Sequence, residues 1–312
     1  MKYPNVASLK QAYLKGENIT TLIKQLDATN LNSAEAIELA YDLQAGSYVD
    51  AVLKAPHKFK PYYDQLREIL AKYIVENDCI LDAGTGEMTT LGGVFSQINI
   101  NLARFYCFDI SLSRLLVGRR HISKTCSIDF AAKLFPFAAD ISTIPLEDNA
   151  VDLTWTSHAL EPNHGREFEL LAELFRVTKR TCLLFEPSYE NNTIEGKNRM
   201  EKLGYVRDLP NQIKKAGGDL VDIVKINAAD QLSPLNPTYA YIVSIHKSDS
   251  GSAIGSNKCF QCPTTNEPLD CSRQDSLFSS KGLIAYPVIS GIPLLRRGLA
   301  IPACHTELLT EI

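Results

Sequence analysis

The residues best suited to chemistry lie where a short apolar run meets a glycine-rich turn. In the segment 79–87 the apolar run ends at Asp82, and the chain then passes through Gly84 and Gly86. An apolar run bounded by glycine is typical of a buried parallel strand. The two glycines allow a sharp turn and a close approach of a ligand. The dinucleotide-binding pattern needs a third glycine, which is missing here. Because Asp82 and Glu87 would repel a bare pyrophosphate, the segment indicates a cationic ligand with an amino-acid head group.

Two further strand-like runs also end in an acidic residue. Residues 104–111 contain Asp109 near their end, and residues 134–139 lead into Asp140 and Ile141. A carboxylate at the end of a second strand can accept hydrogen bonds from both hydroxyls of a ribose. An acid at the end of a single strand is more often a helix N-cap than a ligand contact. Their repetition after successive apolar runs predicts one ligand site at the carboxyl edge of a parallel sheet.

The segment after the next predicted strand, 151–157, holds the groups that could act on a second substrate. Ligands bind at this edge of open α/β sheets. General-base catalysis requires an ionisable group within hydrogen-bond reach of the proton. The candidate bases are His158, Glu161 and His164. Either histidine could instead be a capping or hydrogen-bonded loop residue. A fifth predicted strand, 181–186, brings Glu186 and Tyr189 to the same edge as candidate substrate contacts.

A helical region, residues 1–74, precedes the first predicted strand. The Asn-Ser-Ala-Glu sequence at 32–35 resembles a capping box and predicts a helix start. Tyr48, Tyr62 and Tyr63 follow in a segment rich in aromatic and basic residues. These tyrosines are candidate contacts for a substrate, and tyrosines half-buried between helices are the alternative.

The Asp-x-Gly-x-Gly pattern at 82–86, with the acids that follow, resembles the class I S-adenosylmethionine (SAM) methyltransferases, of the type 11/25-like group. The resemblance covers residues 75–247. It implies an α/β fold with a seven-stranded, mostly parallel, Rossmann-like sheet behind an N-terminal helical cap. The SAM-binding residues that it implies are Asp82, Gly84, Thr85, Gly86, Asp109, Ile110, Asp140, Ile141 and Ser157. Runs at 220–226 and 238–245 lie too close together for a parallel crossover, so we expect one reversed strand at the edge of the sheet.

The C-terminal part resembles a second family. A linker rich in Gly and Ser, residues 248–257, leads to residues 258–312. Cys-x-x-Cys-Pro at 259–263 and Tyr-Pro-x-x-x-Gly-Ile-Pro at 286–293 resemble the Trm112-like zinc-ribbon modules. A ribbon of about 40 residues has a marginal core. We therefore expect a small β-rich module that docks on the chain's own methyltransferase domain.

The metal ligands of that module are incomplete. The second Cys-x-x-Cys of the family is replaced by Phe278 and Lys281. A structural zinc site needs four N or S ligands, whereas Cys259, Cys262 and Cys271 supply three. A fourth would have to come from Cys304 or His305. The sequence favours a module without metal, with apolar packing in its place.

Composition excludes several function classes. The net charge of −4 provides no electrostatic footprint for a nucleic-acid backbone. No apolar run has the length of a membrane span, and no signal peptide is evident. Eight cysteines, mostly within apolar runs, suggest reduced thiols and a cytoplasmic protein.

The expected activity is SAM-dependent methyl transfer to a hydroxyl or amine of a small polar metabolite or a sugar-containing precursor. One alternative is an RNA methyltransferase that uses the ribbon to hold its substrate. Another is a non-catalytic SAM-binding scaffold with a built-in Trm112-like stabilising module.

Overall fold

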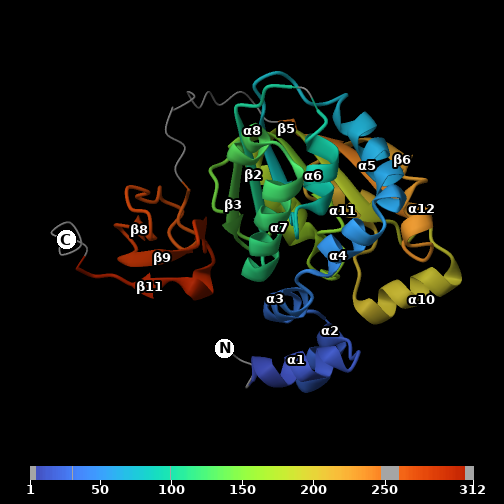
Figure 1. Cartoon of the computed structure of the whole chain (residues 1–312), viewed down its shortest axis with the longest axis horizontal. Helices are drawn as coiled ribbons and strands as arrows, with labels where there is room; N and C mark the ends of the chain where they lie inside the picture. Colours follow the sequence, from blue (N-terminus) through green and yellow to red (C-terminus); the bar gives the residue numbers. More distant parts are fainter. Residues whose placement is uncertain (1–4, 30, 99, 247–259, 306–312) are drawn as a thin grey trace.

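The computed structural model of the protein describes residues 5–29, 31–98, 100–246 and 260–305, and a seven-stranded sheet forms its centre (Figure 1). The strand order is β3-β2-β1-β4-β5-β7-β6, and β1 to β5 pair in parallel. The strands are β1 Cys79–Ala83, β2 Arg104–Asp109, β3 Leu134–Ala138, β4 Val151–Ser157, β5 Thr178–Pro187, β6 Asp219–Lys225 and β7 Thr238–Ser244. The predicted seven-stranded, mostly parallel α/β fold is confirmed.

The reversed strand does not lie at the edge of the sheet, contrary to our expectation. β7 runs antiparallel to both of its neighbours, β5 and β6, and β6 forms the edge. The connection from β6 to β7 contains only the one-turn helix α12 (Ala229–Leu232), which is too short for a parallel crossover. The short connection correctly predicts that β6 and β7 pair antiparallel. It does not specify which of the two strands forms the edge of the sheet, and the prediction that the reversed strand forms it was wrong.

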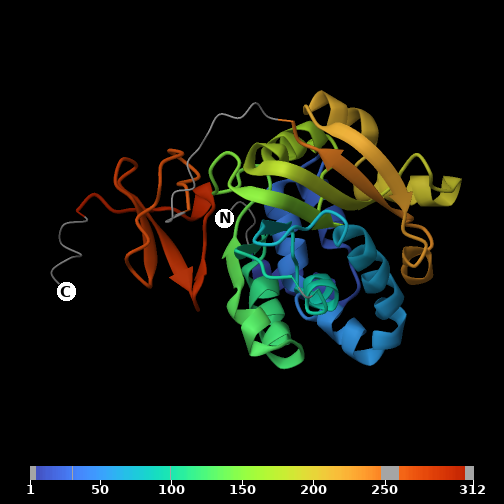
Figure 2. The same ribbon diagram turned by 90° about the horizontal axis from the view of Figure 1, so that it is seen from above.

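Helices cover both faces of the sheet (Figure 2). One face packs against α9 (Glu167–Val177) and α11 (Leu209–Lys215). The other packs against α5 (Pro56–Leu70), α6 (Thr89–Phe95) and α7 (Leu112–Thr125). Neighbouring residues of β1 point to opposite cores, as in any strand buried on both faces. The remaining helices of this part are α8 (Ile128–Ala132) and α10 (Ile194–Leu203).

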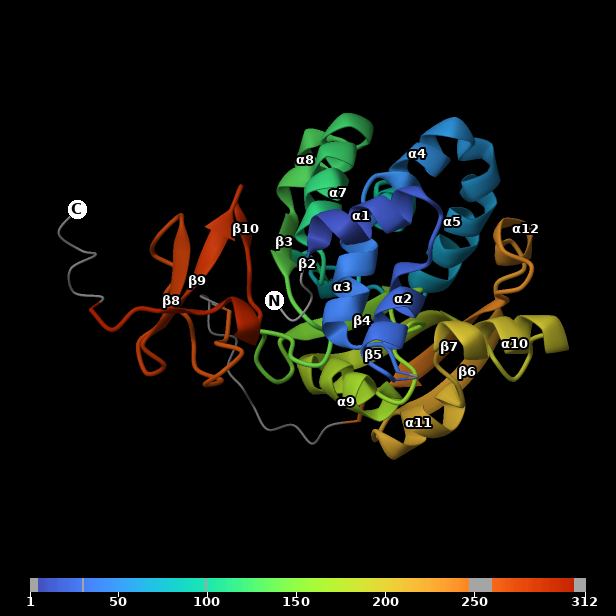
Figure 3. The same ribbon diagram turned by 90° about the horizontal axis from the view of Figure 1, so that it is seen from below.

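The N-terminal helices form a separate layer against the carboxyl edge of the sheet (Figure 3). The helices α1 (Val6–Leu14), α2 (Ile19–Leu26) and α3 (Ala34–Leu43) share a small apolar core that includes Leu9, Ile23 and Ala40. Ser33 caps α3 by accepting a hydrogen bond from the amide of Ala36 at 3.2 Å. The helix α4 (Ser47–Lys54) then leads into α5.

Residues 260–305 form a small antiparallel module beside β3 (Figures 1 and 2). Its strands are β8 (Ser276–Ser279), β9 (Ile284–Ile289), β10 (Ile292–Pro293) and β11 (Ile301–Pro302), and a 3₁₀ turn covers Arg297–Leu299. The β9–β10 hairpin turns through Ser290 and Gly291, both with positive φ, which is the favoured two-residue hairpin turn. The predicted linker and Cys259 lie outside the described residues.

The module docks on the edge strand of the main sheet. The amide of Leu295 donates to the carbonyl of Ala138 at 2.8 Å, and Leu294 forms a parallel bridge with Ala138. The rings of Phe260 and Phe137 lie 5.0 Å apart. Since Leu295 is fully buried within the core of the larger domain, the module shares that core, as its small size led us to expect.

The module also contacts the N-terminal layer. Arg296 forms an ion pair with Glu38 of α3, with 2.5 Å between Nη1 and Oε1. Arg119 of α7 donates to the carbonyl of Ser290. The C-terminal module is therefore joined both to the sheet edge and to a helix that closes the candidate site. Within the described ranges, none of the helices has the length and apolar character required to cross a bilayer.

Candidate functional site

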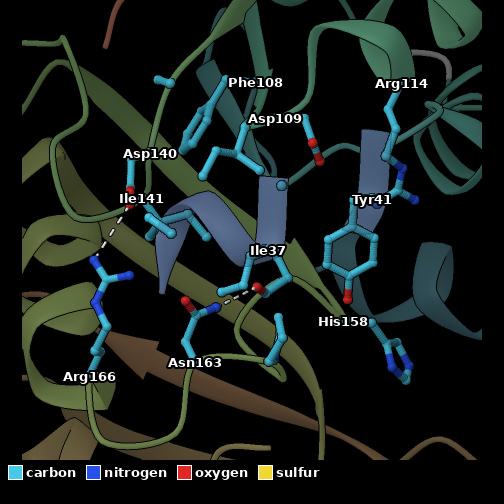
Figure 4. Close-up of a pocket in the computed structure, with 16 residues that line it drawn as sticks. Ile37, Tyr41, Phe108, Asp109, Arg114, Asp140, Ile141, His158, Asn163 and Arg166 are labelled. Atoms are coloured by element: carbon cyan, nitrogen blue, oxygen red, sulfur yellow. Dashed lines mark hydrogen bonds and ion pairs between the residues drawn. The ribbon is translucent and has the colours of Figure 1, made fainter. Parts of the chain in front are cut away.

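A cavity lies at the carboxyl ends of the central strands (Figure 4). The topology explains its position, because β1 lies between β2 and β4 and the crossovers diverge to opposite faces there. Its lining includes the sequence-predicted residues Gly84, Asp109, Ile110, Asp140, Ile141 and His158. The structure thus brings together residues from the ends of β1, β2, β3 and β4.

Asp109 and Asp140 retain capacity to bind a ligand. Asp109 accepts from the amides of Gly86 at 3.0 Å and Ser111 at 2.9 Å, one on each carboxylate oxygen. Asp140 accepts from the amide of Ser142 at 2.8 Å, and Arg166 lies 3.7 Å away. A carboxylate has about four acceptor positions. Both acids therefore have positions left for the hydroxyl or amino groups of a ligand.

The glycine turn is closely covered by the protein itself. Gly84 and Gly86 have φ of +77° and +56°, which favours glycine at both positions. A Cβ on Gly84 would lie 2.3 Å from Cβ of Ala159, and one on Gly86 would lie 2.7 Å from the guanidinium of Arg114. These contacts explain why neither position accommodates a larger residue, and they leave the cavity to one side of the turn.

Asp82 does not line the cavity but lies buried behind the turn. Thr85 donates to Asp82 at 2.6 Å between Oγ1 and Oδ2, and Asp82 is only 3% exposed. Burial raises the pKa of Asp82 to about 8, and the negative charge of Asp109 adds to the rise against the Thr85 hydrogen bond. Asp82 thus supports the turn through its hydrogen bond with Thr85. A cation bound nearby would favour the ionised form of the Asp82 carboxyl.

The second acid of the turn has a structural partner. Glu87 is almost fully buried, and its carboxylate accepts from the amides of Gly46 at 3.0 Å and Val49 at 2.8 Å. These amides lie at the start of α4, where helix N-terminal donors have no partner within the helix. Glu87 therefore anchors α4 beside the site.

Sequence reasoning missed Arg114 of α7. Its guanidinium lies between the rings of Tyr41 and Tyr48, 4.9 and 4.7 Å from their centroids, and 4.0 Å from Glu87. Its buried Nε has no hydrogen-bond partner. Tyr48, predicted as a substrate contact, is 44% exposed and stacks on Arg114 outside the cavity lining. The helix contains further arginines at 119 and 120, and nothing in the pattern singles out one of them.

The helix α3 closes the cavity opposite the sheet, and we call it the lid helix. Its residues Ile37 and Tyr41 line the cavity (Figure 4). Asp42 of this helix accepts from the hydroxyl of Ser111 at 2.7 Å, two residues after Asp109. Asn32, just before the helix, donates to the carbonyl of Pro162 at 2.8 Å. The lid is thus attached at both ends to segments that carry the site.

His158 and Glu161 form a partly buried ion pair rather than two free bases: the Glu161 side chain is 10% exposed and the His158 side chain 28%. Nδ1 of His158 lies 2.8 Å from Glu161, and Nε2 lies 2.9 Å from the hydroxyl of Thr238. Asn236 also donates to Glu161 at 3.1 Å. Burial disfavours the charged form of both side chains, but the attraction between them is stronger than this effect. The pKa of His158 is therefore raised and the pKa of Glu161 is lowered. Acting as a base would require His158 to release a partner.

Glu186 is fully buried next to this pair. Its Oε1 accepts from the hydroxyl of Thr156 at 2.7 Å and from the amides of Ala159 and Leu160, while its buried Oε2 has no hydrogen-bond partner. Burial raises the pKa of Glu186 to about 7, although the charge of His158 opposes the rise. Glu186 holds the segment after β4 in place and does not line the cavity.

The other predicted site residues lie outside the cavity lining. Tyr62 and Ser157, predicted separately, bind each other with 2.9 Å between their hydroxyl oxygens. Tyr63 is buried against Gly93 of α6. Two residues have acidic partners farther from the sheet edge: His164 bonds Glu167 at 2.8 Å, and Tyr189 donates to Glu201 at 2.6 Å.

In the described part of the module, the positions of the missing zinc ligands have other roles. Phe278 is buried in β8, and Lys281 pairs with Glu267 at 2.8 Å. The Cys262 thiol contacts the hydroxyl of Tyr286 at 3.5 Å. No group of ligands able to hold a metal occurs among the described residues, which include Cys271, Cys304 and His305 but not Cys259.

No known protein family matches the sequence, and no curated protein matches it. Solved structures are similar in fold. A SAM-dependent methyltransferase from Aquifex aeolicus has 15% identity and a TM-score of 0.43, covering 57% of this chain and 88% of its own. A complex between the Haloferax volcanii Trm112 methyltransferase activator and a putative methyltransferase has 15% identity and a TM-score of 0.49. The match covers 65% of this chain and 96% of the matched chain. A geranyl diphosphate C-methyltransferase from Streptomyces coelicolor A3(2) has 11% identity and a TM-score of 0.45. The match covers 59% of this chain and 77% of the matched chain. Similarity at this level does not specify activity or substrate.

Proposed function

We propose that the protein is a SAM-dependent methyltransferase. The observation that carries the proposal is the convergence of the glycine turn after β1 with Asp109 at the end of β2 and Asp140 after β3 on one cavity. Acids with free acceptor positions suit a ligand that carries hydroxyl and amino groups. The fold, with β7 reversed inside the β6 edge, supports the same proposal.

Within this proposal the cavity residues would hold SAM, which supplies an electrophilic methyl group on a sulfonium ion. Asp109 would accept from ribose hydroxyls, and Asp140 with Ile141 would bind the adenine. Gly84 lines the cavity, and its positive φ is a conformation that glycine adopts without strain. The lid helix would exclude water with Ile37 and Tyr41. Methyl transfer needs alignment of the two substrates above all.

We propose that the acceptor is a small polar metabolite or sugar-containing precursor, methylated on oxygen or nitrogen. The groups on the acceptor side, led by His158 and Glu161, are polar; Glu161 is buried and His158 is half-buried. A purely apolar acceptor would leave such groups desolvated without partners. His158 or Glu161 would receive the acceptor's proton only if the acceptor displaces one of the hydrogen bonds of the pair.

Replacing Asp109 with Ala is expected to weaken SAM binding by roughly 10- to 150-fold, because a hydrogen bond to a charged group contributes about 1.5–3 kcal/mol. Calorimetric titration with SAM measures this change, and circular dichroism checks that the variant folds. Asp222→Ala provides the control, since Asp222 is exposed on the edge strand β6. Absence of SAM binding by the wild-type protein would refute the proposal. Equal binding by wild type and Asp109→Ala would refute the assigned role.

We propose that residues 258–312 are a Trm112-like module that has lost its metal and stabilises the methyltransferase domain of its own chain in the cytoplasm. Buried Phe278 and the Lys281 ion pair support the loss of two ligands. We expect less than one zinc per chain by elemental analysis after purification without added metal. One tightly bound zinc, lost in the Cys262→Ser variant, would contradict this.

A further inference from the structure

Arg199 of α10 has an unsatisfied cationic group beside the acceptor side of the site. Its guanidinium carbon lies 5.5 Å from the ring centroid of Tyr205. Its Nη1 is buried without a hydrogen-bond partner. Across the described residues, no ion pair of Arg199 is found. Besides burial, its positive charge acts to lower the pKa of His158, which places the guanidinium within electrostatic range of that ring. A buried donor of a charged group rarely remains without an acceptor.

A continuous set of contacts connects Arg199 with the cavity. The residue after Tyr205, Val206, donates its amide to the carbonyl of Glu161 at 2.9 Å. The carboxylate of Glu161 pairs with His158, and His158 lines the cavity. Burial raises the pKa of Tyr205, and the charge of Arg199 acts against that rise. Arg199 therefore lies on the Glu161 side of the His158–Glu161 pair, next to the cavity but not in its lining.

The other cations around the cavity already have acidic neighbours. Arg166 faces Asp140 at 3.7 Å, Arg114 faces Glu87 at 4.0 Å, and His158 pairs with Glu161 at 2.8 Å. Among the described residues near the site, Arg199 has no such neighbour. A negatively charged group of a ligand would give Arg199 the acidic neighbour that the other cations already have.

We propose that Arg199 binds a carboxylate or phosphate group of the acceptor, so that the methylated metabolite is an anion. This inference rests on the proposed methyltransferase function. The guanidinium offers a planar pair of donors that fits either oxyanion. Stacking on Tyr205 holds the plane in one orientation. Acceptors that lack the anionic group would leave Arg199 unsatisfied, which provides a basis for substrate selection.

The test compares wild type, Arg199→Gln and Lys197→Gln. Lys197 lies on the same helix but contacts the ring of Tyr189 instead, so its variant controls for the loss of one positive charge. Thermal unfolding is followed through the single, buried Trp155, with S-adenosylhomocysteine present. Inorganic phosphate and succinate serve as probes of the two oxyanions, against sodium chloride at equal ionic strength. A short oligoribonucleotide forms a third arm.

We expect phosphate or succinate to stabilise wild type and Lys197→Gln, with apparent affinity at least about tenfold weaker in Arg199→Gln. Phosphate stabilises folded proteins in general, so the difference between variants is the readout. Equal responses of wild type and Arg199→Gln, or no response of wild type, would overturn the proposal. An Arg199-dependent response to the oligoribonucleotide alone would overturn the small-molecule acceptor. Calorimetric titration with SAM is run in parallel. Absence of SAM binding by the wild-type protein would refute the methyltransferase function, whatever the outcome for Arg199.

Discussion

Raising the pH from about 5 to about 8 is expected to destabilise the wild-type protein by about 4 kcal/mol more than the Asp82→Asn variant. Asp82 is buried, and its pKa is raised from 3.8 to about 8. The folded state therefore holds a proton that the unfolded state releases at much lower pH. Stability from this group is present below the unfolded pKa and is lost as the pH rises toward the folded pKa. The Asn side chain holds the same shape without titrating.

Urea unfolding at several pH values, followed by the fluorescence of Trp155, measures this difference. Glu186 also has a raised pKa, but it contributes equally to both proteins, so the comparison isolates Asp82. Asp222→Asn, at an exposed position, should follow the wild-type curve. Parallel pH curves for wild type and Asp82→Asn would show that Asp82 is ionised in the folded protein.

Replacing Glu161 with Gln is expected to lower the free energy of unfolding by roughly 3 kcal/mol near pH 5.5, because it breaks an ion pair whose carboxylate is buried. The lowered pKa of Glu161 gives stability that is complete above its usual 4.5 and lost on acidification. The raised pKa of His158 gives stability that is complete below its usual 6.5 and lost as the pH rises. The ion pair therefore contributes fully to stability only between about pH 4.5 and pH 6.5.

Urea unfolding at pH 5.5 tests the loss, and the titration of the His158 ring by nuclear magnetic resonance tests its cause. In Glu161→Gln the pKa of His158 should fall. The control is Glu169→Gln, an exposed acid that pairs with Arg166 at 3.2 Å, which should change stability by less than about 1 kcal/mol. An unchanged His158 titration in Glu161→Gln would mean that Glu161 does not set the charge of His158.

The strands and the acids at their ends could be predicted because both depend on local sequence. An apolar run that stops at an acid or a glycine has few other uses in a parallel sheet. Asp109 and Asp140 therefore meet at one cavity, as predicted from their positions at the ends of neighbouring strands. The place of β7 inside the edge could not be predicted, since it depends on which strand pairs with β5 across the sheet.

The rest of the cavity comes from the loop after β4 and from helices, where one residue in a polar segment carries no distinguishing pattern. Arg114 and Arg166 line the cavity, and so do Ile37 and Tyr41 of the lid helix. Nothing local in these helices indicates which side chains face the sheet edge. The capping residue Ser33 indicates where the lid begins, whereas its position over the site depends on Asp42 and Asn32 contacting residues far along the chain.

Residue type alone was also insufficient for the predicted bases. His158 adopts φ of +56° at the end of β4, a conformation that non-glycine residues seldom adopt. It is bonded to Glu161 and Thr238. The sequence shows three candidate bases within seven positions but not that two of them neutralise each other. Ser157 and Tyr62, which are far apart in sequence, likewise bind each other.

The order in which the chain is synthesised gives the contact between the module and β3 a further meaning. The ribosome releases the lid helix and β3 long before Leu294 and Leu295, which cover the edge at Ala138. Until then the nascent chain exposes an unpaired strand edge, a known starting point for aggregation. Arg296, which reaches Glu38 of the lid helix, follows directly. Translation through this short segment thus covers the sheet edge and secures the lid in one step, and we expect products that stop before it to require chaperones.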